Sequence, residues 1–81
     1  GEVRQPSWED RRRLILDHFR TVIDREERKM AMFKLKTFTG LYSKGLPDGL
    51  ALRRRIQSLP HPESFVEAIE RFFEELIPRA A

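Results

Sequence analysis

The sequence predicts an all-α fold, a small four-helix, bundle-like domain. Three observations lead to this prediction. Apolar residues recur three and four positions apart in four successive segments, proline and glycine separate these segments, and no stretch shows the sustained alternation of a β-strand. With 81 residues, 40% of them hydrophobic, and six Phe, the chain has enough apolar material for one core.

The first helix is expected at about residues 8–24. Ser7 is suited to cap it, because its hydroxyl can accept a hydrogen bond from a first-turn N–H, and acidic residues follow directly. Arg11, Arg12 and Arg13 are interpreted as a solvated face, paired with Glu9 and Asp17 at helical spacing. The predicted core positions of this helix are Ile15, Leu16, Phe19, Val22 and Ile23.

The second helix is expected at about residues 26–44. It should end at Gly45, which is expected to adopt the left-handed conformation common after helices. Lys34 lies on the flank of its apolar face, and Phe33, Thr37 and Gly40 lie on the opposite side. The predicted core face comprises Ala31, Met32, Leu35, Phe38, Leu41 and Tyr42, and the predicted outer face carries Lys29, Lys36 and Lys44.

Two further helices complete the prediction. A short one over about 47–57 starts at Pro47, and the last one over about 62–77 has Pro62 at its first position, with His61 as its cap. In the short helix, Leu50, Leu52 and Ile56 are expected to point inward. The last helix buries Phe65, Val66, Ile69, Phe72, Phe73 and Leu76, and its outer face carries Glu63, Glu67, Glu70, Glu74 and Glu75.

Charge is concentrated in the middle of the chain. Residues 28–55 hold eight basic residues and one acidic residue, a local charge of 8 − 1 = +7, although the whole chain carries only +3. This asymmetry indicates a polyanionic partner. Six basic residues are the candidate phosphate contacts: Lys29, Lys36, Lys44, Arg53, Arg54 and Arg55.

Catalytic chemistry is not expected in this chain. It has no Cys, no glycine-rich phosphate loop, and two histidines, His18 and His61, without metal-ligand spacing. We therefore predict no catalytic, cofactor-binding or metal-binding residue here, and no apolar run is long enough for a transmembrane helix. Residues 1–7 are expected to be a tag remnant or linker, 8–77 a helical RNA-docking domain and 78–81 a tail.

The central stretch resembles the C-terminal helical domain of the tRNA-dihydrouridine synthase family. The resemblance is carried by the aromatic Phe38, by Gly40 and Tyr42, by the turn Lys44-Gly45-Leu46-Pro47, and by the following Leu52-Arg53 with Ile56. It covers about residues 8–77 in helix order and about twenty residues in motif. Many members have a Lys-His pair where this chain has Thr37-Phe38, and a Trp where it has Leu41. If that pair contacts RNA in those members, Lys36 or Lys34 substitutes for it here or the contact is lost.

The resemblance implies a role in tRNA processing. In that family the helical domain holds tRNA against a separate TIM barrel, a flavoprotein domain that uses FMN and NADPH to reduce uridines. This chain would be the tRNA-binding module of such an oxidoreductase, without cofactors of its own, with its own barrel domain as a second partner and with a cytoplasmic location. Lys36, Lys44 and Arg54 are the first candidates for tRNA contacts, and Tyr42 is expected in the core.

Two alternatives remain open from the sequence. The first is a helical protein–protein interaction module whose basic face binds an acidic partner, which should show a contiguous exposed apolar patch. The second is a DNA-binding module, which would favour Asn, Gln or Arg on one exposed helix face. The second predicted helix offers Lys, Thr and Gly there, a composition better suited to phosphate contacts than to base readout.

Overall fold

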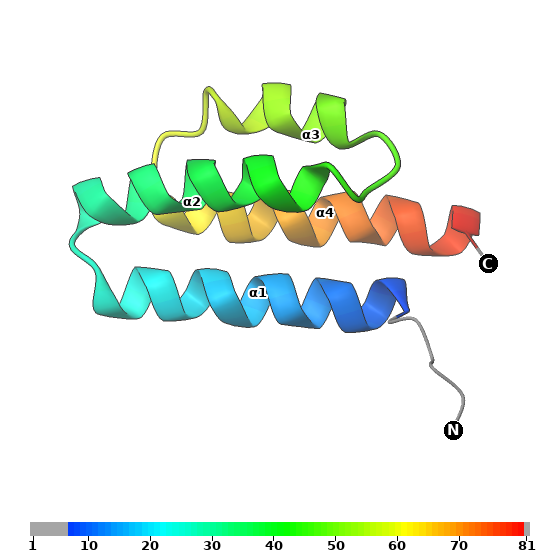
Figure 1. Cartoon of the computed structure of the whole chain (residues 1–81), viewed down its shortest axis with the longest axis horizontal. Helices are drawn as coiled ribbons and strands as arrows, with labels where there is room; N and C mark the ends of the chain where they lie inside the picture. Colours follow the sequence, from blue (N-terminus) through cyan, green and yellow to red (C-terminus); the bar gives the residue numbers. More distant parts are fainter. Residues whose placement is uncertain (1–6, 81) are drawn as a thin grey trace.

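The computed structural model describes residues 7–80, and within this range the chain forms four α-helices and no strand (Figure 1). This confirms the predicted all-α, four-helix fold. The helices are α1 (Trp8–Arg25), α2 (Arg28–Ser43), α3 (Gly49–Ile56) and α4 (Pro62–Ala80). Of the residues predicted to be a linker, 1–6 lie outside the described range.

Helix α2 lies between α1 and the short α3 (Figure 1). Helices α1 and α2 run antiparallel beside each other, and α4 passes behind α2 and contacts all three other helices. Because α3 contacts α2 and α4 but not α1, it closes the side of the domain opposite to α1. The basic central segment, which contributes α2 and α3, is thus folded into two neighbouring helices.

The start of α1 is determined by a reciprocal cap. The Ser7 hydroxyl accepts a hydrogen bond from the Asp10 N–H at 3.1 Å, and the Asp10 carboxylate accepts one from the Ser7 N–H at 3.3 Å. Both groups satisfy backbone donors that lack partners inside the helix. The predicted cap at Ser7 and the first helical residue, Trp8, are therefore confirmed.

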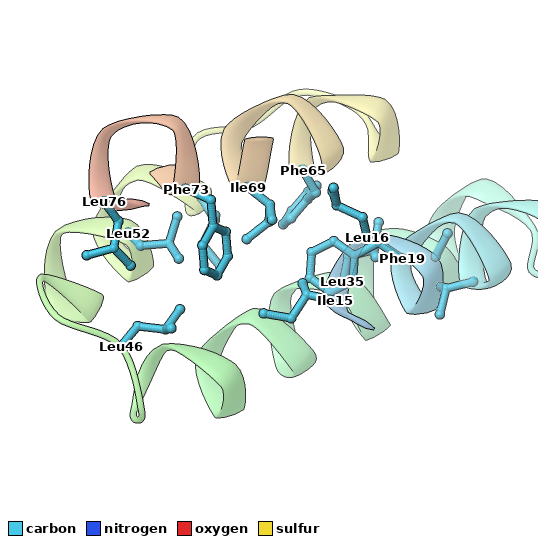
Figure 2. Packing of buried hydrophobic residues seen from close by; sticks show 13 residues of the cluster. Ile15, Leu16, Phe19, Leu35, Leu46, Leu52, Phe65, Ile69, Phe73 and Leu76 are labelled. Atoms are coloured by element: carbon cyan, nitrogen blue, oxygen red, sulfur yellow. The ribbon is translucent and has the colours of Figure 1, made fainter. Parts of the chain in front are cut away.

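The core is one continuous cluster with contributions from all four helices. Phe19, Leu35, Phe65 and Phe73 are fully buried in it. Figure 2 shows Leu46, from the connection between α2 and α3, turned toward the same core as the side chains of α3 and α4. Leu46 thereby holds the Lys-Gly-Leu-Pro turn against the bundle.

The boundaries and the buried face of α2 differ from the prediction. The helix begins at Arg28 and not at 26, because the Glu26 N–H still bonds to the Val22 carbonyl of α1 and Glu27 is the N-cap residue. Leu41, predicted in the core, is 58% exposed, whereas Thr39 and Ser43 are buried. The buried residues of α2 are Ala31, Leu35, Thr39 and Ser43, and the backbone of Ser43 lies close to Gly49 of α3.

The turn after α2 also differs from the prediction. No glycine of the described range has a positive φ, so the expected left-handed conformation at Gly45 is wrong, and Asp48 takes it instead with φ 58°. Helix α3 starts at Gly49, two residues after the predicted Pro47, because Asp48 serves as its N-cap residue. Gly49, Leu52 and Ile56 form its buried face, and Leu50, predicted to point inward, is 60% exposed.

Helix α4 begins at Pro62 as predicted and continues to Ala80, three residues past the predicted end. Its extra turn contains Pro78, so most of the predicted tail is helical. Directly before α4, the His61 carbonyl accepts a hydrogen bond from the Ser64 N–H, and the His61 ring lies 3.0 Å from the Ser64 hydroxyl. His61 therefore has the structural position at the helix start that was expected.

Candidate nucleic-acid interface

The six candidate phosphate contacts lie at the surface of α2 and α3. Lys29 is in the first turn of α2, Lys36 is in its middle, Lys44 follows its last residue, and the three arginines form the last turn of α3. Five of the six are exposed and Lys36 is half-buried. The two helices that carry these cations pack against each other.

The three arginines of α3 point in different directions, because they occupy consecutive positions of one helix. Since successive residues turn by about 100° around the axis, Arg54 points away from the buried Leu52 and Ile56. Arg53 and Arg55 project from opposite flanks of α3, about 200° apart. The sequence alone required only that at least one of the three face solvent or a partner.

Arg55 belongs to the α4 side of α3. It lines a hollow of about 230 Å³ between these helices together with Glu75 and Arg79, and a second hollow of about 160 Å³ together with Glu67. These glutamates belong to the acidic outer face of α4, so Arg55 lies in a mixed electrostatic environment. Since Arg53 projects from the opposite flank of α3, it faces the α2 side.

Without Arg55, the candidate cations of α2, of α3 and of the turn between them define one basic surface. We call it the α2–α3 surface. It comprises Lys29, Lys36, Lys44, Arg53 and Arg54.

None of these five cations, nor Arg55, forms an ion pair with a carboxylate of residues 7–80. Four other cations of the described residues are paired, whereas Arg11, Arg13, Arg25, Arg28 and Arg71 also form no ion pair there. Arg12 contacts Glu9 at 2.9 Å, Arg20 contacts Glu70 at 3.2 Å, Lys34 contacts Glu26 at 2.5 Å, and Arg79 contacts Asp48 at 3.4 Å. Unpaired cations gathered on one surface are available to an external anion.

Lys34, one of the two lysines considered for an RNA contact, is paired with a carboxylate. Lys34 and Lys36 were alternatives for an RNA contact that the resembled family would make with other residues. Lys34 donates to the Glu26 carboxylate at the junction between α1 and α2, and its ammonium is thereby partly neutralised. Of these two lysines, Lys36 is the one left free for a ligand among the described residues.

Acidic residues occupy a different part of the surface. Four of the five predicted outer-face glutamates of α4 are exposed, and Glu70 is half-buried. Helix α4 lies behind α2 in Figure 1, so its outward side is turned away from the outward side of α2. The domain thus carries opposite charges on different sides, and a polyanion is directed toward the basic one.

The turn that carries Lys44 is attached to α1. The Arg11 guanidinium donates a hydrogen bond to the Gly45 carbonyl at 3.2 Å and lies 5.1 Å from the ring centre of Trp8. Arg11 was interpreted as part of a solvated face, which is wrong for this residue, although the Arg12–Glu9 pair is formed as expected. Asp17, the second predicted acidic partner, forms no ion pair with the described residues.

Behind the basic surface, a small aromatic cluster joins α1 to α2. The His18 Nδ1 and the Tyr42 hydroxyl are 2.8 Å apart, and the rings of His18 and Phe38 are 4.4 Å apart. Burial raises the pKa of the Tyr42 hydroxyl above its ordinary value. Tyr42 therefore has the interior role expected of it. The contribution of His18 was missed, although its spacing from Ile15 and Val22 places it beside the core.

Exposed apolar side chains accompany the cations. Met30, Phe33 and Leu41 on α2 and Leu50 on α3 are each more than 40% exposed, and Phe33 is the most exposed of them at 68%. On α2 the exposed apolar residues are separated by Thr37. They form an interrupted row and not one continuous apolar patch.

No protein-family model, curated protein or solved structure matches this chain. Within the described residues, no group of three or more His, Cys, Asp or Glu side chains is arranged to hold a metal ion. No helix of this range is both long enough and apolar enough to cross a membrane.

Proposed function

We propose that this chain is a tRNA-binding helical domain that positions tRNA for uridine reduction by a separate FMN-dependent TIM-barrel domain. The single observation that carries the proposal is the α2–α3 surface, where five cations without an ion pair lie on two adjacent helices. The Lys-Gly-Leu-Pro turn and the basic helix after it, which carry the resemblance to the tRNA-dihydrouridine synthases, contribute Lys44, Arg53 and Arg54 to this surface.

The composition of the surface favours phosphate contacts over base readout. Three of the five cations are lysines, which act as point charges toward phosphate, and no Asn or Gln accompanies them on α2 or α3. Lys29, Lys36 and Lys44 follow one another at about two helical turns each, a spacing suited to contacts with a phosphate backbone along the helix. Such contacts determine position and carry little sequence information directly.

The alternative function is a helical protein–protein interaction module with a basic face. Its support is the exposed row of Met30, Phe33 and Leu41 on α2. This row is interrupted by Thr37 and bordered by cations, whereas the centres of protein interfaces are typically depleted of charge. The observations therefore favour a nucleic acid.

The proposal is tested by measuring the affinity of the 81-residue chain for unmodified tRNA and for duplex DNA over a series of salt concentrations. The test variant combines Lys36→Ala, Lys44→Ala and Arg54→Ala. Each lost phosphate contact should reduce the slope of log K against log salt by about 0.7–0.9, so the triple variant should lose about two units of slope. The unaltered chain should prefer tRNA to duplex DNA.

A matched control removes the same number of charges elsewhere. Arg12→Ala, Arg20→Ala and Arg79→Ala together change three cations that are already paired with carboxylates. This control should keep most of the slope of the unaltered chain. Equal slopes for the two triple variants, or no preference for tRNA, would contradict the proposal and leave the protein-binding alternative in its place.

A further inference from the structure

We infer that Phe33 is a stacking platform for an unpaired base of the bound RNA, placed beside the phosphate contacts of the α2–α3 surface. This inference rests on the proposed function and adds a second kind of contact to it. It concerns a residue that the charge argument does not use.

The exposure of Phe33 is the first observation. Its side chain is 68% exposed, although aromatic residues usually bury most of their surface in cores or interfaces. It does not belong to the core cluster, and no aromatic ring of the described range is paired with it. The ring is therefore available to a ligand.

The space beside Phe33 is the second observation. A shallow hollow of about 330 Å³ lies next to the ring at the start of α2, lined by Glu27, Lys29, Met30 and Phe33. The hollow is local to the first turns of α2, because all its lining residues lie between 27 and 33. It suits one flat group lying on the ring better than a long partner helix.

The charge around Phe33 is the third observation. Lys29 lies one turn before it and Lys36 one turn after it, so both project from the same side of α2 as the ring. Neither lysine has a carboxylate partner among the described residues. A ring between two free cations fits a nucleotide, whose base can stack while its neighbouring phosphates contact the lysines.

Other exposed apolar residues of α2 and α3 also lie one helical turn from a cation. Leu41 lies three residues before Lys44, and Leu50 lies three and four residues before Arg53 and Arg54. Each exposed apolar side chain thus has a cation one helical turn away. Interleaved apolar and basic side chains are typical of grooves that bind single-stranded nucleic acid, and Phe33 is the aromatic member of the series.

A protein partner is the competing explanation for an exposed Phe. A face-to-face contact with a second copy of this chain through α2 would place the basic surfaces against each other, and like charges disfavour it. An acidic protein would match the charge and would also bury the ring, but such a contact depends on apolar area and tolerates Leu in place of Phe. Base stacking requires the aromatic face, and this difference provides the test.

The test compares Phe33→Ala, Phe33→Leu and Phe33→Tyr in the 81-residue chain, with unmodified tRNA and with a fully paired RNA duplex. Stacking predicts that Phe33→Ala and Phe33→Leu weaken tRNA binding at least about fivefold and that Phe33→Tyr restores it. Binding to the duplex, which offers no unpaired base, should change little. The salt slope should also stay the same, since no phosphate contact is removed.

Leu14→Ala is the matched control, because Leu14 is 62% exposed on α1, away from the α2–α3 surface. It should leave tRNA affinity unchanged. Since Phe33 is mostly exposed, its variants should keep the helical circular dichroism of the unaltered chain, which separates a binding effect from unfolding.

The outcomes distinguish the two proposals. If the unaltered chain does not prefer tRNA, the proposed function fails and the stacking role fails with it. If it prefers tRNA but Phe33→Ala binds equally well, or Phe33→Leu restores binding as well as Phe33→Tyr, only the stacking role is overturned. In that case Phe33 is left as a contact for a protein partner.

Discussion

The backbone of Gly49 lies directly against the carbonyl group of Ser43, where the start of α3 meets the end of α2. A Cβ atom at Gly49 would lie 1.9 Å from the Ser43 carbonyl oxygen and 2.8 Å from its carbonyl carbon. Because these are backbone atoms, no side-chain rotation can relieve the contact. This close approach places α3, and the arginines of its last turn, beside α2.

Gly49→Ala should therefore destabilise the domain by about 1–3 kcal/mol, as overpacking in a filled core does. Gly40→Ala is the matched comparison, since a Cβ atom there meets nothing within 4 Å and the residue lies in the interior of α2. It should stabilise the domain by about 0.5–1 kcal/mol. Urea unfolding followed by circular dichroism measures both, and destabilisation by both variants would contradict the packing explanation.

The arginines of α3 should contribute unequally to RNA binding. Arg54 points outward and Arg55 lies beside glutamates of α4. Arg54→Ala should reduce the salt slope of tRNA binding by about one unit, as expected for a lost phosphate contact. Arg55→Ala should reduce it by less than half as much. The two slopes are measured under identical conditions, and equal losses would mean that Arg55 also reaches the RNA.

Tyr42 should make stability depend on alkaline pH. Its raised pKa means that, above about pH 10, the hydroxyl ionises in the unfolded chain before it ionises in the folded one. The stability it contributes is complete below pH 10 and is lost as the pH rises from there through the folded-state pKa. Tyr42→Phe should abolish this part of the decline.

At neutral pH, the same substitution should cost about 0.5–1.5 kcal/mol, because it removes the hydrogen bond to His18. Urea unfolding at several pH values measures both effects. Tyr42 is the only tyrosine in the chain, so its ionisation can also be followed by ultraviolet absorbance without assignment. An identical alkaline decline in both proteins would show that other groups cause it.

Arg11 should stabilise the turn that carries Lys44. Arg11→Ala removes the hydrogen bond to the Gly45 carbonyl and the contact with the Trp8 ring, and should cost about 1 kcal/mol. Arg13→Ala is the control, since Arg13 is exposed and should be near neutral. The melting temperatures of the two variants are compared by thermal unfolding. Equal values would mean that Arg11 does not stabilise the turn and belongs to the solvated face.

Local patterns in the sequence were sufficient to predict the all-α class of the fold and its four helices. Apolar spacing, the cap at Ser7 and the proline at the first position of α4 depend on interactions within a few residues, so they can be recognised without a partner helix. The basic middle of the chain was visible for the same reason, because charge can be counted along the sequence.

Three features could not be predicted from local patterns: the buried face of α2, the position of the left-handed residue, and the separation of Arg55 from the other basic residues. Leu41 and Leu50 are hydrophobic but exposed, and the small residues Gly49 and Ser43 lie against each other where α3 meets α2. Arg55 is separated from Arg54 because α4 packs beside one flank of α3. Each of these features depends on contacts between residues distant in sequence, which local periodicity does not encode.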